Sequence, residues 1–195
     1  MKTNFSYLDG RKEFELFGPA CMDAEKVLGT SPVMSAVASR KALELCVKWI
    51  YAVDSGTLGT PREDGLQFLL HNNGFPSLMD YNLWRRLQYV VKNGNMSVHT
   101  SKILSRDDAI LSLNILFDFA QWVEYCYGME YEERKFDEDL IPDATAESRR
   151  IEEKYAQVIK DIQKNADKIV DEKEKKIQEL LRINAELRRE RAQKK

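Results

Sequence analysis

Residues 31–52 read SPVMSAVASRKALELCVKWIYA, and this stretch decides the fold class. Ser31 and Pro32 are residue types favoured at the N-cap and at the first position of an α-helix. Apolar side chains then recur mostly at steps of three and four residues: Met34, Val37, Leu43, Cys46, Val47 and Ile50. Such spacing gathers them on one face, so the stretch predicts a long helix that packs in a core.

The neighbours of this stretch also predict helices. Residues 11–28 predict a rougher helix that breaks near Gly18-Pro19. Downstream, Thr60-Pro61-Arg62-Glu63 has the form of a capping box with a proline inside it, which predicts the start of a short helix. That helix is expected to end near Asn72-Asn73-Gly74, because asparagine and glycine are common at helix C-termini.

Two further helices follow along the chain. Ser77-Leu78-Met79-Asp80 predicts the cap of the first, which is expected to stop at Asn93-Gly94-Asn95. Ser105-Arg106-Asp107-Asp108 is a second capping signal, and the apolar helix after it extends to Cys126. Long alternating strand patterns are absent from the sequence. The sequence therefore predicts an all-α fold, with a compact bundle of about five helices over residues 1–142.

A change of charge marks the end of this bundle. Residues 1–146 carry 15 basic and 21 acidic residues, a net of −6, whereas residues 147–195 carry 15 basic and 11 acidic residues, a net of +4. An acidic connector, residues 128–143, lies before the change. Beyond it, a stripe of positions runs from residue 151 to residue 187 in ten steps over 36 residues, an average of 3.6. Lys173 and Asn184 occupy two of these positions, and the others are apolar or small: Ile151, Tyr155, Val158, Ile162, Ala166, Ile169, Ile177, Leu180 and Leu187.

This pattern predicts one long, charged amphipathic helix over residues 143–195. A single thin apolar stripe does not hold a helix of that length alone. The pattern therefore favours packing on a partner or self-association, including a homodimer through residues 151–187, and the alternative is a solvated spacer. The average step exceeds the 3.5 residues of a left-handed coiled coil, so any coiled coil is expected to be weak.

Composition excludes several classes of protein. No stretch approaches the roughly 20 apolar residues of a membrane span, and no membrane partner is expected. The three cysteines, Cys21, Cys46 and Cys126, are far apart and lie in apolar helical patterns, which predicts buried, reduced thiols in a cytoplasmic protein. No Cys/His spacing resembles a zinc site. No G-x-x-x-x-G-K-S/T phosphate loop occurs, so this chain is not expected to hydrolyse ATP.

One short polar stretch lies between two apolar helices. It runs from Lys92 through Asn95 to His99, and it is expected to form a turn. One interpretation is a HEPN-like ribonuclease, in which an arginine and a histidine are separated by four to six residues, and the arginine stabilises phosphate charge while the histidine moves a proton. Here the basic residue is Lys92, which lacks the planar fork of arginine. The other interpretation is a structural His99 that ties a turn to a helix end.

A second polar feature lies inside the first helix. Arg40 and Glu44 are four residues apart and therefore share a face, with Lys41 and Lys48 nearby. Simple surface pairing is one interpretation. The other is a semi-buried ion pair that faces the polar turn around Asn95 and fixes the geometry of the bundle.

Together these segments resemble a known module. The resemblance rests on segments 39–51 (SRKALELCVKWIY), 94–99 (GNMSVH), 105–109 (SRDDA) with Phe119, Trp122 and Tyr125, and 131–137 (YEERKFD). They are similar to the helical N-terminal module found ahead of the nuclease and motor domains in many type I restriction endonuclease R subunits. Related stand-alone copies form a domain family allied to the HEPN superfamily. The resemblance covers about residues 4–142.

The resemblance implies a role in restriction-modification and phage defence. It places Arg40, Glu44, Gly94, Asn95 and His99 at characteristic positions of the module. The arginine often found three residues before the Gly-Asn pair is Val91 in this chain, which argues against RNA cleavage. No catalytic residue of the R subunit can be carried over. ATP and Mg²⁺ are implied only for the other domains of such a subunit, which is an ATP-dependent, type I site-specific deoxyribonuclease.

The resemblance therefore predicts a non-catalytic interaction module, and we expect the chain to be a fragment of a longer R subunit. Its implied partners are the other domains of that subunit and the methylation and specificity subunits, with DNA as a further candidate. Two alternatives stay open: a HEPN-like ribonuclease or toxin, and a dimeric helical scaffold that uses the long C-terminal helix.

Overall fold

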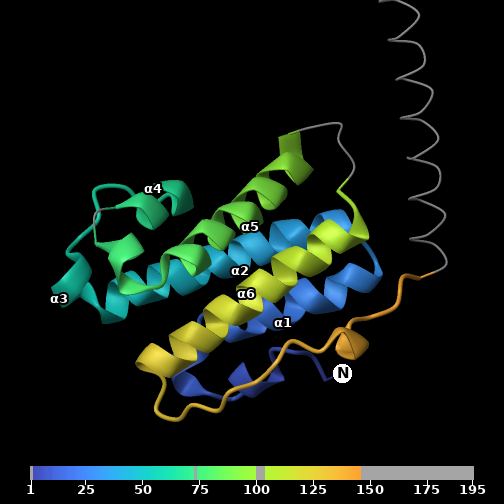
Figure 1. Cartoon of the computed structure of the whole chain (residues 1–195), viewed down its shortest axis with the longest axis horizontal. Coiled ribbons are helices and arrows are strands. Elements are labelled where there is room, and N and C mark those ends of the chain that lie inside the picture. Colours follow the sequence, from blue (N-terminus) through green and yellow to red (C-terminus); the bar gives the residue numbers. More distant parts are fainter. Residues whose placement is uncertain (1, 73, 100–103, 146–195) are drawn as a thin grey trace, which may run out of the picture. The chain divides into compact units, whose positions relative to one another are not determined.

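The computed structural model describes residues 2–72, 74–99 and 104–145 (Figure 1). Over these ranges the chain is all-α and contains no strand, which confirms the predicted fold class. Its helices are α1 (Gly18–Lys26), α2 (Pro32–Val53), α3 (Ser55–Leu58), α4 (Leu66–His71), α5 (Tyr81–His99) and α6 (Arg106–Tyr127). Short 3-10 turns flank them: η1 (Ser6–Leu8), η2 (Lys12–Phe14), η3 (Val27–Gly29), η4 (Phe75–Leu78) and η5 (Glu138–Leu140).

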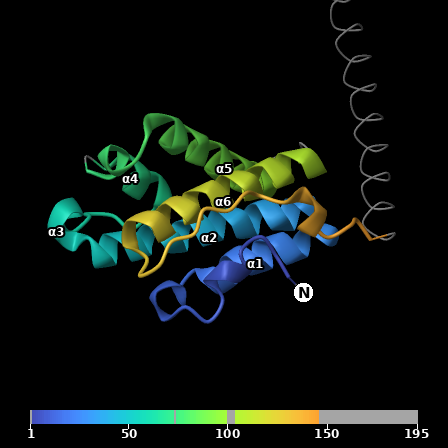
Figure 2. The same ribbon diagram turned by 60° about the horizontal axis from the view of Figure 1, so that its bottom comes forward.

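Helix α2 is the central element of the bundle. Helices α1, α5 and α6 all pack along it, and α5 also packs on α6 (Figures 1 and 2). The core between them contains six fully buried phenylalanines: Phe5, Phe14, Phe17, Phe75, Phe117 and Phe119. Large aromatic side chains bury more apolar area than any other residue type, so they contribute much of the stabilisation.

Helix α5 runs antiparallel to α2. Its C-terminal half meets the first half of α2, where Gly94 contacts Arg40. At the other end, Trp84 of α5 and Tyr51 of α2 donate hydrogen bonds to the neighbouring carbonyl oxygens of Leu70 and Leu69 in α4. The short helix α4 is thereby fixed to both long helices.

Two predicted helix caps are confirmed. The Ser31 hydroxyl accepts a hydrogen bond from the backbone N–H of Met34 at 3.2 Å and starts α2. Ser105 and Asp108 form a reciprocal capping box at the start of α6. Both caps satisfy backbone donors that a first helical turn leaves without partners.

The predicted stop at Asn93-Gly94-Asn95 is wrong, because α5 continues through these residues to His99. Gly94 serves a helix contact here and not a C-terminal cap, and Asn93 is buried against α6. The segment 92–99 is accordingly the last part of a helix and not a polar turn.

The predicted start at Thr60-Pro61-Arg62-Glu63 is also wrong. Residues 60–65 are not helical, and α4 begins at Leu66 after Gly65. Nothing buries the side chains of residues 62–64, whereas three leucines at steps of three and one residues, Leu66, Leu69 and Leu70, are buried and stabilise the helix. The start of α4 is therefore set by burial of its apolar face and not by the capping pattern at residues 60–63.

The first helix is shorter than predicted. Residues 12–14 form only a 3-10 turn, and α1 begins at Gly18 with Pro19 in its first turn, so the Gly18-Pro19 pair is a helix start and not a break. Proline is favoured there because the first N–H groups of a helix have no partner within it.

The prediction for the cysteines is correct at two positions and wrong at the third. Cys21 and Cys46 are buried, but Cys126 near the end of α6 is exposed. All three are free thiols. Burial, with a neighbouring hydrogen bond to Cys21, raises the pKa of Cys46 well above its ordinary value. None of the helices in the described ranges is long and apolar enough to cross a lipid bilayer.

The connector after α6 returns along the bundle to the start of α2. The amide of Asn4 donates to the carbonyl of Asp137 at 2.9 Å, and its carbonyl accepts from the Asp137 N–H at 2.7 Å. Further on, the N–H of Thr145 donates to the carbonyl of Gly29 at 2.9 Å. Contacts with the bundle therefore extend slightly past the predicted boundary at residue 142.

The long helix predicted for residues 143–195 and the homodimer stripe 151–187 lie, except for 143–145, outside the described residues.

Candidate functional site

Of the residues singled out in α2 and α5, Arg40 and Gly94 meet where the two helices cross. A Cβ atom added to Gly94 would overlap the Cβ of Arg40 and lie 2.8 Å from its Cδ and 3.0 Å from its Cγ. Carbon atoms in proteins normally stay about 3.5 Å or more apart. Only glycine therefore fits at this position, and its absence of a side chain sets how closely α2 and α5 approach.

Beside this contact, Glu44 is the centre of a local charge network. Its carboxylate lies 2.8 Å from Nζ of Lys48 and 3.6 Å from both Nη1 of Arg40 and Nζ of Lys41. The Glu44 side chain is 15 % exposed, whereas those of Arg40 and Lys41 are 31 and 58 % exposed. The cluster is thus partly buried, which is intermediate between simple surface pairing and a semi-buried ion pair.

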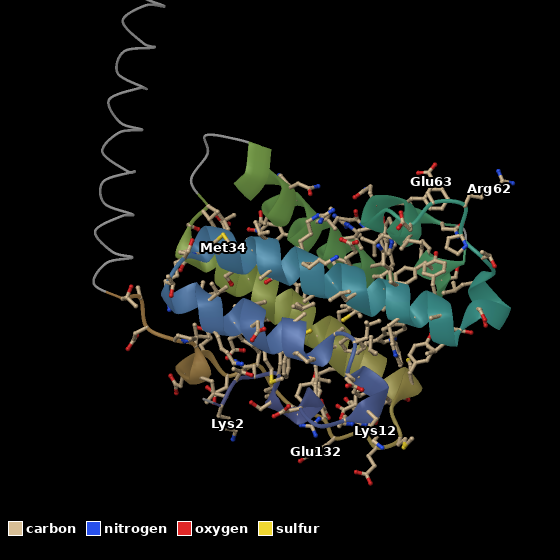
Figure 3. All side chains as sticks on the ribbon, turned by 180° about the vertical axis from the view of Figure 1, so that it is seen from behind. Lys2, Lys12, Met34, Arg62, Glu63 and Glu132 are labelled. Atoms are coloured by element: carbon tan, nitrogen blue, oxygen red, sulfur yellow. The ribbon has the colours of Figure 1, made fainter. Side chains whose placement is uncertain are left out.

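The charges in this network control the ionisation of Glu44. Burial by itself would raise its pKa, but the hydrogen bond from Lys48 and the charges of Lys41, Lys48 and Arg40 outweigh it, so the pKa of Glu44 is lowered. The same hydrogen bond raises the pKa of Lys48. Lys48 also lies 3.6 Å from Asp64 in the loop before α4. Figure 3 shows the neighbouring Arg62 and Glu63 pointing from that loop into solvent.

The Arg40 side chain acts here through its shape more than through its charge. Its stem covers Gly94, while its Nε atom is buried and has no hydrogen-bond partner among the described residues. A buried N–H without a partner costs about 1–3 kcal/mol. Arg40 is therefore constrained by packing and pairs only loosely with Glu44.

The remaining candidates lie along the second half of α5. Lys92 and Asn95 are exposed, and Val91 is 4 % exposed. His99 is the last residue of α5, seven residues after Lys92, which corresponds to about 10 Å along a helix axis. The side chain of His99 lies outside the described part of the chain.

Asn93, between these positions, joins α5 to α6. Its amide donates to the Ser112 hydroxyl at 3.0 Å and to the Asp108 carbonyl at 3.3 Å. One turn earlier, the Tyr89 hydroxyl donates to the Asp108 carboxylate at 2.5 Å. The crossing of α2 and α5 is thus tied to the capped start of α6, which brings together three of the segments that carry the resemblance.

Sequence reasoning missed a second polar cluster, which is built on Glu124 near the end of α6. Glu124 is 1 % exposed, and its two carboxylate oxygens bind Arg11 Nη1 and, at 2.7 Å, Arg134 Nη1. Gln121 adds a hydrogen bond to Glu124 at 3.2 Å and accepts one from the Arg134 N–H at 2.9 Å. An acidic residue inside the apolar pattern of α6 was the available signal.

A third polar contact holds the N-terminal segment. Both oxygens of the buried Glu25 carboxylate accept the backbone N–H of Asn4, at 3.0 and 3.1 Å. Burial raises the pKa of Glu25, and the hydrogen bonds from Asn4 offset only part of that shift. This contact and the Glu124 cluster hold chain segments in position.

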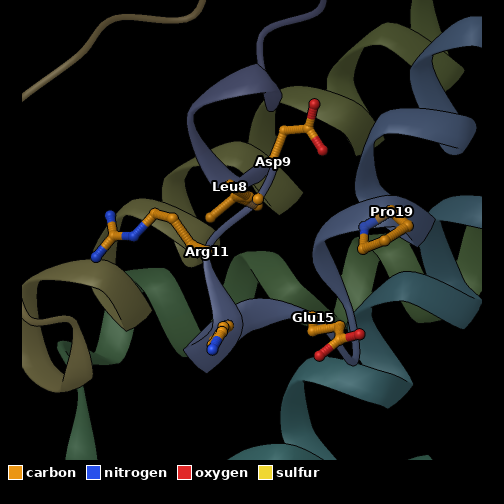
Figure 4. A pocket seen from close by; sticks show the side chains of 7 residues that line it. Leu8, Asp9, Arg11, Glu15 and Pro19 are labelled. Atoms are coloured by element: carbon orange, nitrogen blue, oxygen red, sulfur yellow. The ribbon is translucent and has the colours of Figure 1, made fainter.

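Three surface depressions in the described part of the bundle lie away from the α2–α5 crossing. One of about 350 Å³ is lined by Leu8, Asp9, Gly10, Arg11, Lys12, Glu15 and Pro19 (Figure 4). Two others, of about 520 and 500 Å³, lie beside α4 and beside the N-terminal segment. Within the described ranges, no group of three His, Cys, Asp or Glu residues is arranged to hold a metal ion.

The chain was also compared with known proteins. No family model, no curated protein and no solved structure matches it.

Proposed function

We propose that this chain is a non-catalytic interaction module of the kind that precedes the nuclease and motor domains of a type I restriction enzyme R subunit. The observation that supports this most is the contact between Gly94 and Arg40. Two segments of the resemblance, 39–51 and 94–99, are more than 40 residues apart in the sequence and meet at this contact.

The architecture supports an interaction role in a second way. The carboxylates at the centres of the two polar clusters are engaged with basic side chains: Glu44 with Arg40 and Lys48, and Glu124 with Arg11 and Arg134. A general acid or base must instead reach a substrate atom within hydrogen-bond distance. These groups stabilise the bundle, which leaves its surface for binding.

The ribonuclease alternative has less support. It needs a basic residue near His99, and the position where the resembling module often carries arginine holds Val91, which is buried. The exposed Lys92 offers a single ammonium group and no bidentate fork. Phosphate charge would therefore be stabilised less well than by arginine.

Reconstitution tests the proposal. A type I R subunit whose own helical module is deleted is mixed with its methylation and specificity subunits, with and without this chain. We expect the chain to co-elute with one of these components in size-exclusion chromatography and to hydrolyse no ATP alone. A chain with Gly94→Val, in which α2 and α5 are forced apart, serves as the negative control, and a Gly56→Ala chain is the positive one.

The proposal is wrong if the chain co-elutes with none of these components. It is also wrong if the purified chain cleaves structured RNA and a stably folded His99→Ala variant loses that cleavage, since this result supports the ribonuclease.

A further inference from the structure

An exposed apolar patch lies where α6 ends and the connector begins. Tyr125, Met129 and Tyr131 are 68, 87 and 45 % exposed. The rings of Tyr125 and Tyr131 meet edge to face with their centroids 5.1 Å apart. We call these three residues the α6-end patch. Tyrosine and methionine are enriched at the centres of protein interfaces, so their grouping on a surface marks a binding site.

The backbone beneath the patch is firmly held. The Tyr127 hydroxyl donates to the Asp54 carboxylate at 3.0 Å, and the Tyr127 ring packs edge-on against Trp49. On the other side of Met129, Arg11 donates to the carbonyl of Glu130 at 3.1 Å. The patch is therefore presented on a rigid support, and a partner that binds it orders little of the chain.

Other exposed apolar side chains lie at the same end of the bundle. Val53, 52 % exposed, ends α2 next to Asp54, which binds Tyr127. Leu16, 54 % exposed, lies next to Phe17, whose ring contacts Trp49. The apolar surface at this end thus extends beyond α6.

The connector beside the patch carries strong negative charge. Residues 128–143 contain two basic residues, and one of them, Arg134, is paired with Glu124 and Glu132. The acidic residues next to the patch are Glu130, Glu132 and Glu133, whereas Asp137, Glu138, Asp139 and Asp143 lie further along the connector, where it returns to the start of α2. Such a surface repels the phosphates of nucleic acids and of anionic lipids, and it attracts cations.

We propose that the α6-end patch docks a basic segment of a partner protein whose apolar side chains cover Tyr125, Met129 and Tyr131. Lysine or arginine residues of that segment pair with the connector carboxylates, foremost Glu130 and Glu133, which lie on either side of Tyr131 in the sequence and are exposed. The inference rests on the interaction role proposed above and adds the chemistry of the partner.

The test uses the whole chain and labelled 18-residue peptides, read by fluorescence anisotropy. The first peptide combines lysines with leucines at three- and four-residue spacing. In the second, glutamate replaces lysine, and in the third, serine replaces leucine. Two variants probe the surface, Tyr125→Ser/Met129→Ser and Glu130→Gln/Glu133→Gln. Met34→Ser is the matched control, because Met34 is 55 % exposed and lies far from Lys12 and Glu132 in Figure 3.

We expect the leucine–lysine peptide to bind and the other two not to bind. Its affinity should fall at least about tenfold in Tyr125→Ser/Met129→Ser and stay unchanged in Met34→Ser. Glu130→Gln/Glu133→Gln should weaken binding and reduce its salt dependence. The peptide experiment and the reconstitution experiment can fail separately. Failure to bind the peptide refutes the proposed partner chemistry, and failure to co-elute refutes the proposed function.

Three outcomes overturn the inference: no binding of the leucine–lysine peptide, equal binding of the leucine–glutamate peptide, or equal losses in the patch variant and in Met34→Ser. A dimer of the whole chain that dissociates in Tyr125→Ser/Met129→Ser also overturns it, because the occupant is then a second copy.

Discussion

Glu44 and Glu124 are carboxylates in two long helices of the same bundle, and their surroundings differ in kind. Glu44 is 15 % exposed, and its closest partners lie within four residues of it in α2. Glu124 is 1 % exposed, and its partners Arg11 and Arg134 come from the N-terminal segment and the connector. The ion pairs of Glu44 form within one helix, whereas those of Glu124 connect α6 to the N-terminal segment and to the connector.

The difference shows which charges the fold depends on. Partly exposed pairs within one helix contribute little, because water already solvates both charges well. A buried carboxylate that binds two arginines has lost its water, so removal of one partner leaves uncompensated buried charge. The α2–α5 crossing therefore depends on the packing of Gly94 against Arg40, whereas the end of α6 depends on charge.

The largest expected effect follows from removal of the buried carboxylate. Glu124→Ala removes the hydrogen bonds that the buried carboxylate accepts from Arg11, Arg134 and Gln121. Because a hydrogen bond to a charged group contributes about 1.5–3 kcal/mol, we expect the free energy of unfolding to fall by about 3–5 kcal/mol. Glu44→Ala is the matched control and should cost at most about 1 kcal/mol. Urea denaturation followed by circular dichroism measures both. Equal costs for the two variants would refute the distinction between the clusters.

The next effect concerns the helix crossing. Gly94→Ala places a methyl group inside the Arg40 side chain, and we expect a loss of about 1–3 kcal/mol in spite of the better helix propensity of alanine. Gly56→Ala in α3 is the control, because a Cβ there meets no atom within 4 Å. It should be neutral or slightly stabilising. A stabilising Gly94→Ala would mean that the helices do not touch at this point.

A smaller effect is expected for the bond between α5 and α6. Asn93→Ala removes the donor to Ser112 and to the Asp108 carbonyl, and it should lower the free energy of unfolding by about 1–2 kcal/mol. The exposed Asn95 provides the control, since Asn95→Ala should change stability by less than about 0.5 kcal/mol. Thermal unfolding of both variants checks this, and a larger cost at Asn95 contradicts it.

The smallest effect depends on pH. The pKa of Glu44 is lowered from its ordinary value of 4.5, so its stabilising contribution is complete above that pH and disappears as the pH falls through the folded-state pKa. Glu44→Gln should therefore be less stable than the parent chain at pH 7, by under about 1 kcal/mol, and equally stable in strong acid. If the difference in stability between the parent chain and Glu44→Gln instead increases towards low pH, Glu44 does not stabilise the fold through its ionised form.

The sequence was sufficient where local signals and burial agree. The capping serines Ser31 and Ser105 lie directly before helices with one apolar face, so α2 and α6 were predicted closely. The caps proposed at residues 60–63 failed because the side chains after them have nothing to pack against, and burial of Leu66 decided the start of α4.

Long-range contacts were not predictable in the same way. A glycine between two asparagines has the local signature of a helix end, and only the approach of Arg40, 54 positions earlier, explains why Gly94 lies inside α5. Likewise, the pattern of α6 marks Glu124 as unusual but does not identify Arg11 and Arg134 as its partners. The sequence therefore identified residues of the candidate site, but only the folded structure shows which of them are in contact.

A double-mutant cycle at Gly94 and Arg40 tests the central claim most directly, namely that this contact sets the spacing of α2 and α5. Urea denaturation gives the free energy of unfolding for the parent chain, Gly94→Ala, Arg40→Gly and the double variant. Because Arg40→Gly removes the atoms that a new Cβ would meet, Gly94→Ala should cost nothing in that background, which corresponds to a coupling of about 1–3 kcal/mol. If Gly94→Ala costs the same in both backgrounds, the two residues are not in contact and the account of the crossing is wrong.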